Sequence, residues 1–579
     1  MGKKSFGIFL IAAILAACGG EEKGVEIPAD GNQTGQLLPP LSDSLLERRV
    51  AGLTAYREEM LQTLALSPPV MAYPDSALRE PYQRLAQELA LSYEPFVKDA
   101  WERESRSPLR TEIMEVRKLE KLETQRMGLN CNPGQCYQVV LYNYFHHTTA
   151  AALVDVFNKK VLKVIDRTEE ARALNPRLRD LARKVVLSNP EIQEKWGPKL
   201  EKAPVQYRDC KCERSLHLCA NVIFSFKNQA LWTLVDLDDF QLLGYKWGAE
   251  PGENPSFVLT ERSLQNEYIM EYYCGVDNTL KKGDWELVYQ LTSSDGMEVK
   301  NARFKGKEAL QSAKIVDWHV SYTYKKGFGY SDAMGCPMFS SAANVASRAP
   351  EVEDIVENGR VAGFALIMDF RSPVWPLPCN YRYQNRYEFY DDGRFRVCGI
   401  NMGQGCGVTG WYRPVFRIDL ASGDDPHVIE QWQEGAWKRK DREFWHEQVA
   451  STAYSPEGFL FKIATAAGGY YLQPSRGQFA YDGRGDNAFS YFVADKQEGA
   501  ADLPAFGPCC NEDYRQGPEA FLEPAEDLDG KSTVIWYVPQ MANNNQAGQQ
   551  HCWTELIIRD GRQSYQTWPG IVGPMFVPF

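Results

Sequence analysis

Seven histidines are the side chains with which this chain could bind a metal ion through imidazole nitrogen. They are His146, His147, His217, His319, His427, His446 and His551. Two ligands on one strand reach the same ion only when they alternate, as in His-x-His, because successive side chains point to opposite faces. No pair among the seven alternates in this way, and neither His-Glu-x-x-His nor Gly-x-Ser-x-Gly occurs. The histidine spacing alone therefore predicts no metal centre, and no serine nucleophile motif is present.

Fourteen cysteines are the second group with reactive side chains, and most are expected to form disulfides. Cys131 and Cys136 flank a Pro-Gly turn and could close a small loop. Cys210, Cys212 and Cys219 are dense enough to raise a zinc alternative, but their spacing fits no common zinc pattern. We therefore expect disulfides there as well.

The adjacent Cys509 and Cys510 are expected to join two separate bridges rather than each other. Apart from Cys18, thirteen cysteines remain, so at least one thiol stays unpaired or pairs outside the chain.

The first eighteen residues have the pattern of an export signal. Lys3 and Lys4 precede an apolar run from Phe6 to Ala17 that is too short to span a bilayer. The following Leu15-Ala16-Ala17-Cys18 resembles the lipobox of bacterial lipoproteins, in which the thiol after the cleavage point receives diacylglycerol. The resemblance implies a signal peptide, lipidation of Cys18, and attachment to a membrane of the bacterial envelope on the periplasmic or cell-surface side. The alternative is an ordinary secreted protein in which Cys18 is incidental.

The formal net charge of -12 and the pI near 5.4 argue against a nucleic-acid-binding protein, which would present a basic face. No later segment has the length and apolarity of a transmembrane helix. The lipid is thus the expected membrane anchor.

The length of 579 residues exceeds what one hydrophobic core usually serves. We expect a signal peptide (1–17), a lipidated tether (18–41), a helical segment (42–128), two small α+β domains (129–205 and 206–290) and a large antiparallel β-sandwich (291–579). Leu153-Val154-Asp155-Val156 and Leu234-Val235-Asp236-Leu237 suggest that the small domains are two copies of one unit, although so short an echo can arise by chance. Within the sandwich, short helices are expected near Pro350–Asn358 and Glu430–Ala436.

Several short motifs, in the same order along the chain, resemble the copper amine oxidases. The motifs are Leu153–Val164 with Leu187–Glu191, Asn380-Tyr381-Arg382-Tyr383, Tyr387–Phe395, Phe416–Leu420, Arg484–Asn487 and Val534–Trp536. The resemblance implies the fold class, α+β with two small domains before a sandwich similar to the catalytic domain of that family. It also implies a dimer, since family members are usually dimers.

The resemblance further implies which positions would carry the family's chemistry. Tyr381 stands where the family's tyrosine is oxidised to topaquinone, and Lys325 stands where its catalytic aspartate would be, with Asp317 and Asp332 nearby. A charged lysine cannot remove the α-proton of an amine adduct. Arg382 replaces an acidic residue beside the tyrosine.

The three imidazole ligands of the family's copper fall on residues that are not histidines. By this register the His-x-His positions are Gly410 and Tyr412, and the third position is Asn543, with His551 as a weak stand-in. We therefore predict no cofactor, and we predict that Tyr381 remains an ordinary tyrosine.

These observations lead to three hypotheses. The first is an envelope lipoprotein that keeps an amine-oxidase-like scaffold without its catalysis and uses it for binding or assembly with an unknown envelope partner. The second is an active primary-amine oxidase, with copper and topaquinone, whose ligands come from His427, His446 or His551 after rearrangement. The third is a carbohydrate- or protein-binding β-sandwich lipoprotein.

Overall fold

The computed structural model describes residues 34–132, 134–167, 174–227, 229–251, 258–323, 325–422, 425–466, 468–475, 478, 486–494 and 497–579. The predicted signal peptide, the predicted lipidation site Cys18 and the first half of the Arg484–Asn487 motif lie outside the described residues. In the ranges above, no helix is long and apolar enough to cross a membrane.

The first small unit is a mostly antiparallel sheet with two of its helices packed on one face. Its strand order is β2-β3-β4-β5-β6, and β2 pairs with β3 in parallel. The strands are β2 Val70–Met71, β3 Thr111–Lys118, β4 Cys136–Asn143, β5 Thr148–Asp155 and β6 Lys160–Arg167; the helices are α3 Gln83–Leu91, α4 Glu94–Val97 and α5 Lys121–Arg126. Tyr137, Val139 and Leu141 alternate along β4 and pack against Ala86 and Ala90 of α3. The alternation of apolar residues that predicted a strand here therefore buries one face against helices.

The second small unit has the strand order β1-β10-β9-β8-β7. Its elements are β1 Gln36–Leu37, α6 Pro176–Ser188, α7 Pro190–Leu200, β7 Val205–Lys211, β8 Leu218–Phe226, β9 Gln229–Asp236, β10 Gln241–Gly248 and α8 Glu261–Tyr272. Val222 and Phe224 of β8 share a core with α6, whereas Cys219 and Ile223 share another with Leu264 of α8. Helices thus cover both faces of this sheet.

The sequence echo marks equivalent hairpins in the two small units. Asp155 ends β5 and Asp236 ends β9. In each case Oδ1 accepts hydrogen bonds from the backbone N–H groups two and three residues later, at 2.8 to 3.2 Å. The aspartate closes the turn into the next strand. The two echoed segments thus share the same aspartate-closed turn.

Two sequence predictions about the first 128 residues need correction. The last part of the predicted helical segment 42–128 is mostly strand β3, and only α5 after it is helical. The last part of the predicted tether is also ordered, because β1 adds to the edge of β10 and Leu41 N donates to Gln241. The other helices before residue 64, α1 Asp43–Arg49 and α2 Leu53–Thr63, pack in the α6 core.

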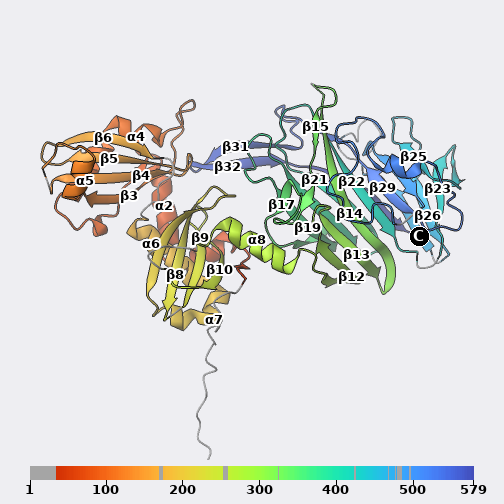
Figure 1. The fold of residues 1–579 in the computed structure, drawn as a ribbon, viewed down its shortest axis with the longest axis horizontal. Coiled ribbons are helices and arrows are strands. Elements are labelled where there is room, and N and C mark those ends of the chain that lie inside the picture. The colour runs from red at the N-terminus through yellow and green to blue at the C-terminus, as the bar shows by residue number, and fades with distance from the viewer. Residues whose placement is uncertain are drawn as a thin grey trace, which may run out of the picture.

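The rest of the chain forms two large sheets packed face to face, in the part that the structure describes (Figure 1). One sheet follows the order β11-β12-β13-β14-β22-β29-β28-β25, and β15 and β30 pair at its side. Its strands are β11 Asn278–Lys282, β12 Trp285–Leu291, β13 Met297–Phe304, β14 Lys307–Tyr322, β15 Gly329–Ser331, β22 Gly410–Leu420, β25 Phe444–Glu447, β28 Phe489–Val493, β29 Val534–Val538 and β30 Met541–Ala542.

The other sheet follows β16-β17-β19-β20-β21-β34-β27-β26-β23-β24, with β18 and β33 beside it. Its strands are β16 Met334–Gly335, β17 Asn344–Ala346, β18 Glu351–Glu357, β19 Arg360–Arg371, β20 Arg382–Tyr390, β21 Phe395–Asn401, β23 Val428–Gln433, β24 Ala436–Lys440, β26 Phe461–Thr465, β27 Gly468–Gln473, β33 Gly570–Val572 and β34 Met575–Pro578. Aromatic side chains such as Trp318, Tyr383 and Phe416 fill the space between the sheets. The expected fold class, with two small α+β units followed by a large antiparallel sandwich, is confirmed.

Both short helices expected within the sandwich are strands. Val352, Ile355 and Val356 are β-branched, and they lie in the exposed edge strand β18. The second segment is the hairpin β23–β24, whose turn residues Glu434 and Gly435 both have positive φ, at 52° and 78°. Such a turn matches the twist of two antiparallel strands.

Five disulfides and three free thiols account for the described cysteines. The bonds are Cys131–Cys136, Cys212–Cys219, Cys274–Cys336, Cys379–Cys406 and Cys509–Cys510. The expectation of separate bridges for Cys509 and Cys510 was wrong, because their two sulfur atoms are bonded to each other. Cys210, Cys398 and Cys552 stay unpaired, as the odd number required.

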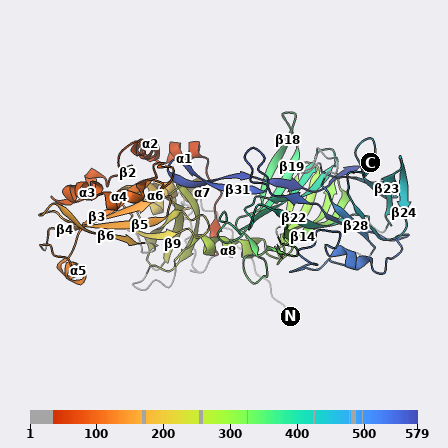
Figure 2. The ribbon, with the colours of Figure 1, turned by 90° about the horizontal axis from the view of Figure 1, so that it is seen from above.

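One hairpin leaves the sandwich and reaches the small units. It consists of β31 Trp553–Arg559 and β32 Arg562–Trp568, which pair only with each other among the described strands. Figure 1 shows it extending from the sandwich to the junction of the two small units, and Figure 2 shows the same course from above. Its tip is held there by a hydrogen bond of 2.7 Å from Arg110 N to Gly561 O.

Candidate functional site

Tyr381 lies buried in the sandwich core, one residue before β20. Its hydroxyl shares a hydrogen bond of 2.7 Å with the hydroxyl of Tyr322, and that second hydroxyl accepts another from Cys406 N. Burial, together with the neighbouring Tyr322, raises the pKa of Tyr381 far above its ordinary value. The phenol is therefore neutral, and the hydrogen bond to Tyr322 fixes its oxygen.

An aromatic stack continues from Tyr381 to an acid. Its ring lies 5.7 Å from that of Tyr383, which in turn stacks on Trp318 at 4.1 Å. The hydroxyl of Tyr383 donates to Asp332 Oδ2 at 2.7 Å. Burial raises the pKa of Asp332 to about 7, and the charge of Asp317 adds to the effect. Of the acids considered from the sequence, Asp332 is thus linked to the stack.

Lys325, at the aligned position of the family's base, is exposed in the turn between β14 and β15. Its Nζ lies 5.4 Å from the centre of the Phe328 ring. Asp317 binds elsewhere, accepting from Trp318 N and from the Ser331 hydroxyl. The contacts of Lys325 and Asp317 in the described part of the chain are thus with Phe328, Trp318 and Ser331.

Arg382 points away from the tyrosine stack, as strand alternation requires. Its Nε donates to Asp369 Oδ2 at 2.8 Å, and Arg348 and Arg371 bind the same carboxylate. Although burial opposes ionisation, these three guanidinium groups hold the pKa of Asp369 well below its usual range. The arginine that replaces the family's acid is therefore part of a buried ion-pair cluster.

The three positions aligned with copper ligands do come together in space. Asn543 Oδ1 accepts from Gly410 N at 2.8 Å, and Asn543 N donates to Gly410 O at 3.0 Å. Asn543 Nδ2 donates to Gly407 O at 2.6 Å. The ring of Tyr412 lies 6.2 Å from that of Tyr381. The alignment is thus spatially consistent, with the Asn543 amide bound to backbone.

These residues do not fit Cu(II), which prefers neutral imidazole nitrogen. Gly410 has no side chain, and burial raises the pKa of Tyr412 well above its ordinary value, which keeps its phenol protonated. Both ends of the Asn543 amide already bind the backbone. His551 is the one imidazole close by, with its Nδ1 3.1 Å from Ala542 O. A single imidazole cannot supply the three nitrogen ligands of such a copper site.

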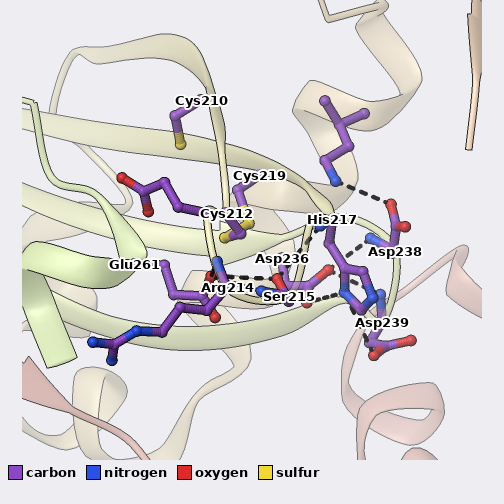
Figure 3. Close-up of a disulfide and its surroundings, with 12 residues drawn as sticks. Cys210, Cys212, Arg214, Ser215, His217, Cys219, Asp236, Asp238, Asp239 and Glu261 are labelled. Carbon is purple, nitrogen blue, oxygen red and sulfur yellow. Dashed lines mark hydrogen bonds and ion pairs between the residues drawn. A yellow bond between two sulfur atoms is a disulfide. The ribbon is translucent and has the colours of Figure 1, made fainter. Parts of the chain in front are cut away.

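The described residues hold a single group of three His, Cys, Asp or Glu side chains whose ligand atoms approach within 4.8 Å of one another. It consists of His217, Asp236 and Asp239, beside the Cys212–Cys219 disulfide (Figure 3). His217 Nδ1 lies 2.7 Å from Asp236 Oδ2 and 3.8 Å from Asp239 Oδ2.

The charges of this group are already balanced. Burial alone would lower the pKa of His217, but the Asp236 carboxylate outweighs it and raises the pKa to about 10. The imidazolium therefore donates to Asp236, and Arg562 binds Asp239 at 2.8 Å. A metal ligand must be deprotonated, so this geometry is that of an ion pair.

Sequence reasoning missed this cluster because its members are spread over residues 217–239 and follow no motif. The one available signal was the echoed aspartate, since Asp155 and Asp236 occupy the same turn position. Asp236 binds His217, which lies directly before the neighbouring strand β8.

No family model matches the sequence, and no curated protein matches it. Solved structures similar to it include a copper-containing benzylamine oxidase from Hansenula polymorpha, with 13% identity and a TM-score of 0.35 over 86% of this chain and 96% of that one. A Pichia pastoris lysyl oxidase has 11% identity and a TM-score of 0.31 over 81% and 85%, and an Aspergillus nidulans amine oxidase has 10% and 0.31 over 86% and 87%. All three are amine oxidases, but at these scores the likeness carries no argument about cofactor, substrate or activity.

Proposed function

We propose that this chain is a bacterial envelope lipoprotein, anchored by a lipid on Cys18, whose amine-oxidase-like body serves binding or assembly and not catalysis. Its partners in this proposal are the membrane and an unidentified envelope component or a second copy of the chain. The export signal and the lipobox-like Leu15–Cys18 support the location. The side chains around Tyr381 support the absence of oxidase chemistry.

The observation that carries the proposal is the closed contact between Asn543 and Gly410. Three hydrogen bonds join the Asn543 side chain and backbone to Gly410 and Gly407, at 2.6 to 3.0 Å. They occupy the donor and acceptor atoms of the amide. The aligned ligand positions therefore stabilise the strand ends around β22 instead of presenting imidazoles.

The environment of Tyr381 supports the same proposal. Its hydroxyl is engaged by Tyr322, and its neutral form is favoured by burial. A tyrosine without a copper site beside it has no route to a quinone by the family's self-processing. We therefore propose that Tyr381 acts as a packing residue of the aromatic core.

Copper content and quinone content test the proposal together. The purified chain, incubated with Cu(II) in air and then desalted, should retain far less than one copper per chain by elemental analysis. A redox-cycling quinone stain should be no stronger than that of the control variant Tyr381→Phe. Stoichiometric copper together with a stain that Tyr381→Phe abolishes would establish the second hypothesis, a rearranged oxidase.

A further inference from the structure

A cavity of about 220 Å³ lies where three parts of the molecule meet. The loop before β8 contributes Arg214, the end of β19 and the segment after it contribute Arg371 and Trp375, and the β31–β32 hairpin contributes Arg559 and Arg562. Figure 1 shows the hairpin spanning from the sandwich to the second small unit, and Figure 3 shows the loop that carries Arg214. An occupant of this cavity would touch all three parts.

The cavity wall carries a large excess of positive charge. Four arginines line it against one carboxylate, that of Asp239. This carboxylate is already bound by Arg562 at 2.8 Å. Arg371 binds Asp369, which two further arginines share. Asp239 and Asp369 thus do not balance the positive charge of the arginines around the cavity.

Arg214 is the clearest case of an uncompensated charge. Its Nη1 and Nη2 donate to the neutral side-chain amides of Gln265 and Asn266, at 2.6 and 2.8 Å. Glu261 is the nearest acid, but its carboxylate accepts from the backbone N–H groups of Arg214 and Ser215. Burial lowers the pKa of Arg214 to about 10, against the attraction of Glu261. The guanidinium is therefore positioned by groups that do not neutralise it.

The opposite wall combines an exposed arginine with packed aromatic rings. Arg559 ends β31 with an exposed side chain, and no ion pair involves it among the described residues. The Trp375 ring packs edge-on against Tyr565 at 4.7 Å, and the Arg371 guanidinium lies 5.9 Å from its centre. Guanidinium groups match the planar geometry of carboxylate and phosphate oxygens.

We propose that this cavity binds a small organic anion with at least two oxyanion groups, carboxylate or phosphate, held by Arg214, Arg371 and Arg559. The inference rests on the proposed binding role of the chain and names the ligand class for it. Because the anion contacts the hairpin, the second small unit and the sandwich together, its binding stabilises their mutual arrangement.

Calorimetric titration of the full chain with citrate and with inorganic phosphate tests the inference. We expect saturable binding of at least one of them, with a matching rise in the thermal unfolding midpoint. Stronger binding of citrate assigns a carboxylate ligand, and stronger binding of phosphate assigns a phosphate ligand. Binding should weaken as salt is added.

The variants Arg559→Gln and Arg214→Gln should each weaken binding about tenfold or more, because each removes a charge-assisted contact. Arg559 is exposed, so its variant keeps the test decisive if Arg214→Gln unfolds. The matched control is Arg360→Gln, an exposed arginine at the opposite end of β19 from Arg371, which should bind as the parent does. No saturable binding of either anion, or binding unchanged in Arg559→Gln, overturns the inference. Such a failure leaves the copper and quinone measurements, and hence the proposed lack of catalysis, unaffected.

Discussion

At the scale of single residues, Asp332 is a buried acid whose surroundings weaken the fold at neutral pH. Burial raises its pKa to about 7, against about 3.9 in an unfolded chain. As pH rises through that window the unfolded chain releases the proton first, so the free energy of unfolding falls, by at most ~4 kcal/mol. Asp332→Asn still accepts the hydrogen bond of Tyr383 and removes this fall. It should therefore match the parent near pH 4 and exceed it at pH 8 in urea denaturation.

Asp369 is the matched control, because its pKa is lowered in the fold whereas that of Asp332 is raised. Arginine charges hold its folded pKa below the ordinary value, so the stability it contributes is present above ~pH 4 and is lost only as pH falls through the folded pKa. Asp369→Asn leaves Arg348, Arg371 and Arg382 without their shared carboxylate and should cost about 3–5 kcal/mol at pH 7. If the free energy of unfolding of Asp332→Asn fell with rising pH as steeply as that of the parent, the raised pKa of Asp332 would be refuted.

At the scale of elements, the β31–β32 hairpin depends on the absence of a side chain at its tip. Gly561 has a φ of +69°, and a Cβ there would lie 2.5 Å from Arg110 N and 2.8 Å from Leu64 Cδ2. Gly561→Ala should therefore push the tip from the first small unit and break the bond from Arg110 N. Hydrogen–deuterium exchange should rise along Trp553–Trp568.

Gly359→Ala is the control for backbone strain at a turn. Gly359 also has a positive φ, +76°, but nothing lies within 4 Å of an added Cβ. Gly359→Ala should cost about 1–2 kcal/mol, because an L-residue is strained in the left-handed region, and should leave exchange in the hairpin unchanged. Equal exchange in Gly561→Ala and the parent would show that the tip contact does not hold the hairpin.

At the scale of the whole molecule, a lipid on Cys18 would be the attachment to the membrane. Cys18→Ala, expressed in a bacterial host, should move the chain from the detergent phase to the aqueous phase in Triton X-114 partitioning. The reason is that the acyl chains supply the apolar area that enters the bilayer. Cys210→Ser, which changes an unpaired thiol inside the second small unit, should partition as the parent does. An unaltered partition of Cys18→Ala would point to an ordinary secreted protein.

The sequence predicted the order of units well because apolar periodicity is local. The hairpin before Val164, the helix α6 and the sandwich follow from it directly. Strand β3 and the edge strand β18 were missed because charged residues alternate with their β-branched residues and resemble a solvated helix. Pairing with a neighbouring strand determines their structure. The register of Gly410 and Asn543 was predictable from a motif, whereas the arginine-lined cavity was not. Its residues come from segments more than 100 positions apart, which only the tertiary fold brings together.

The pairing of β1 with β10 sets how far the body can stand from a bilayer. Gln36 is fixed beside Tyr245, so at most seventeen residues, 19–35, separate a lipid on Cys18 from the folded surface. Fully extended, that length is ~60 Å. The edge of the second small unit at β1 would then stay within that distance of the membrane, and the reach of the rest of the body would add to it.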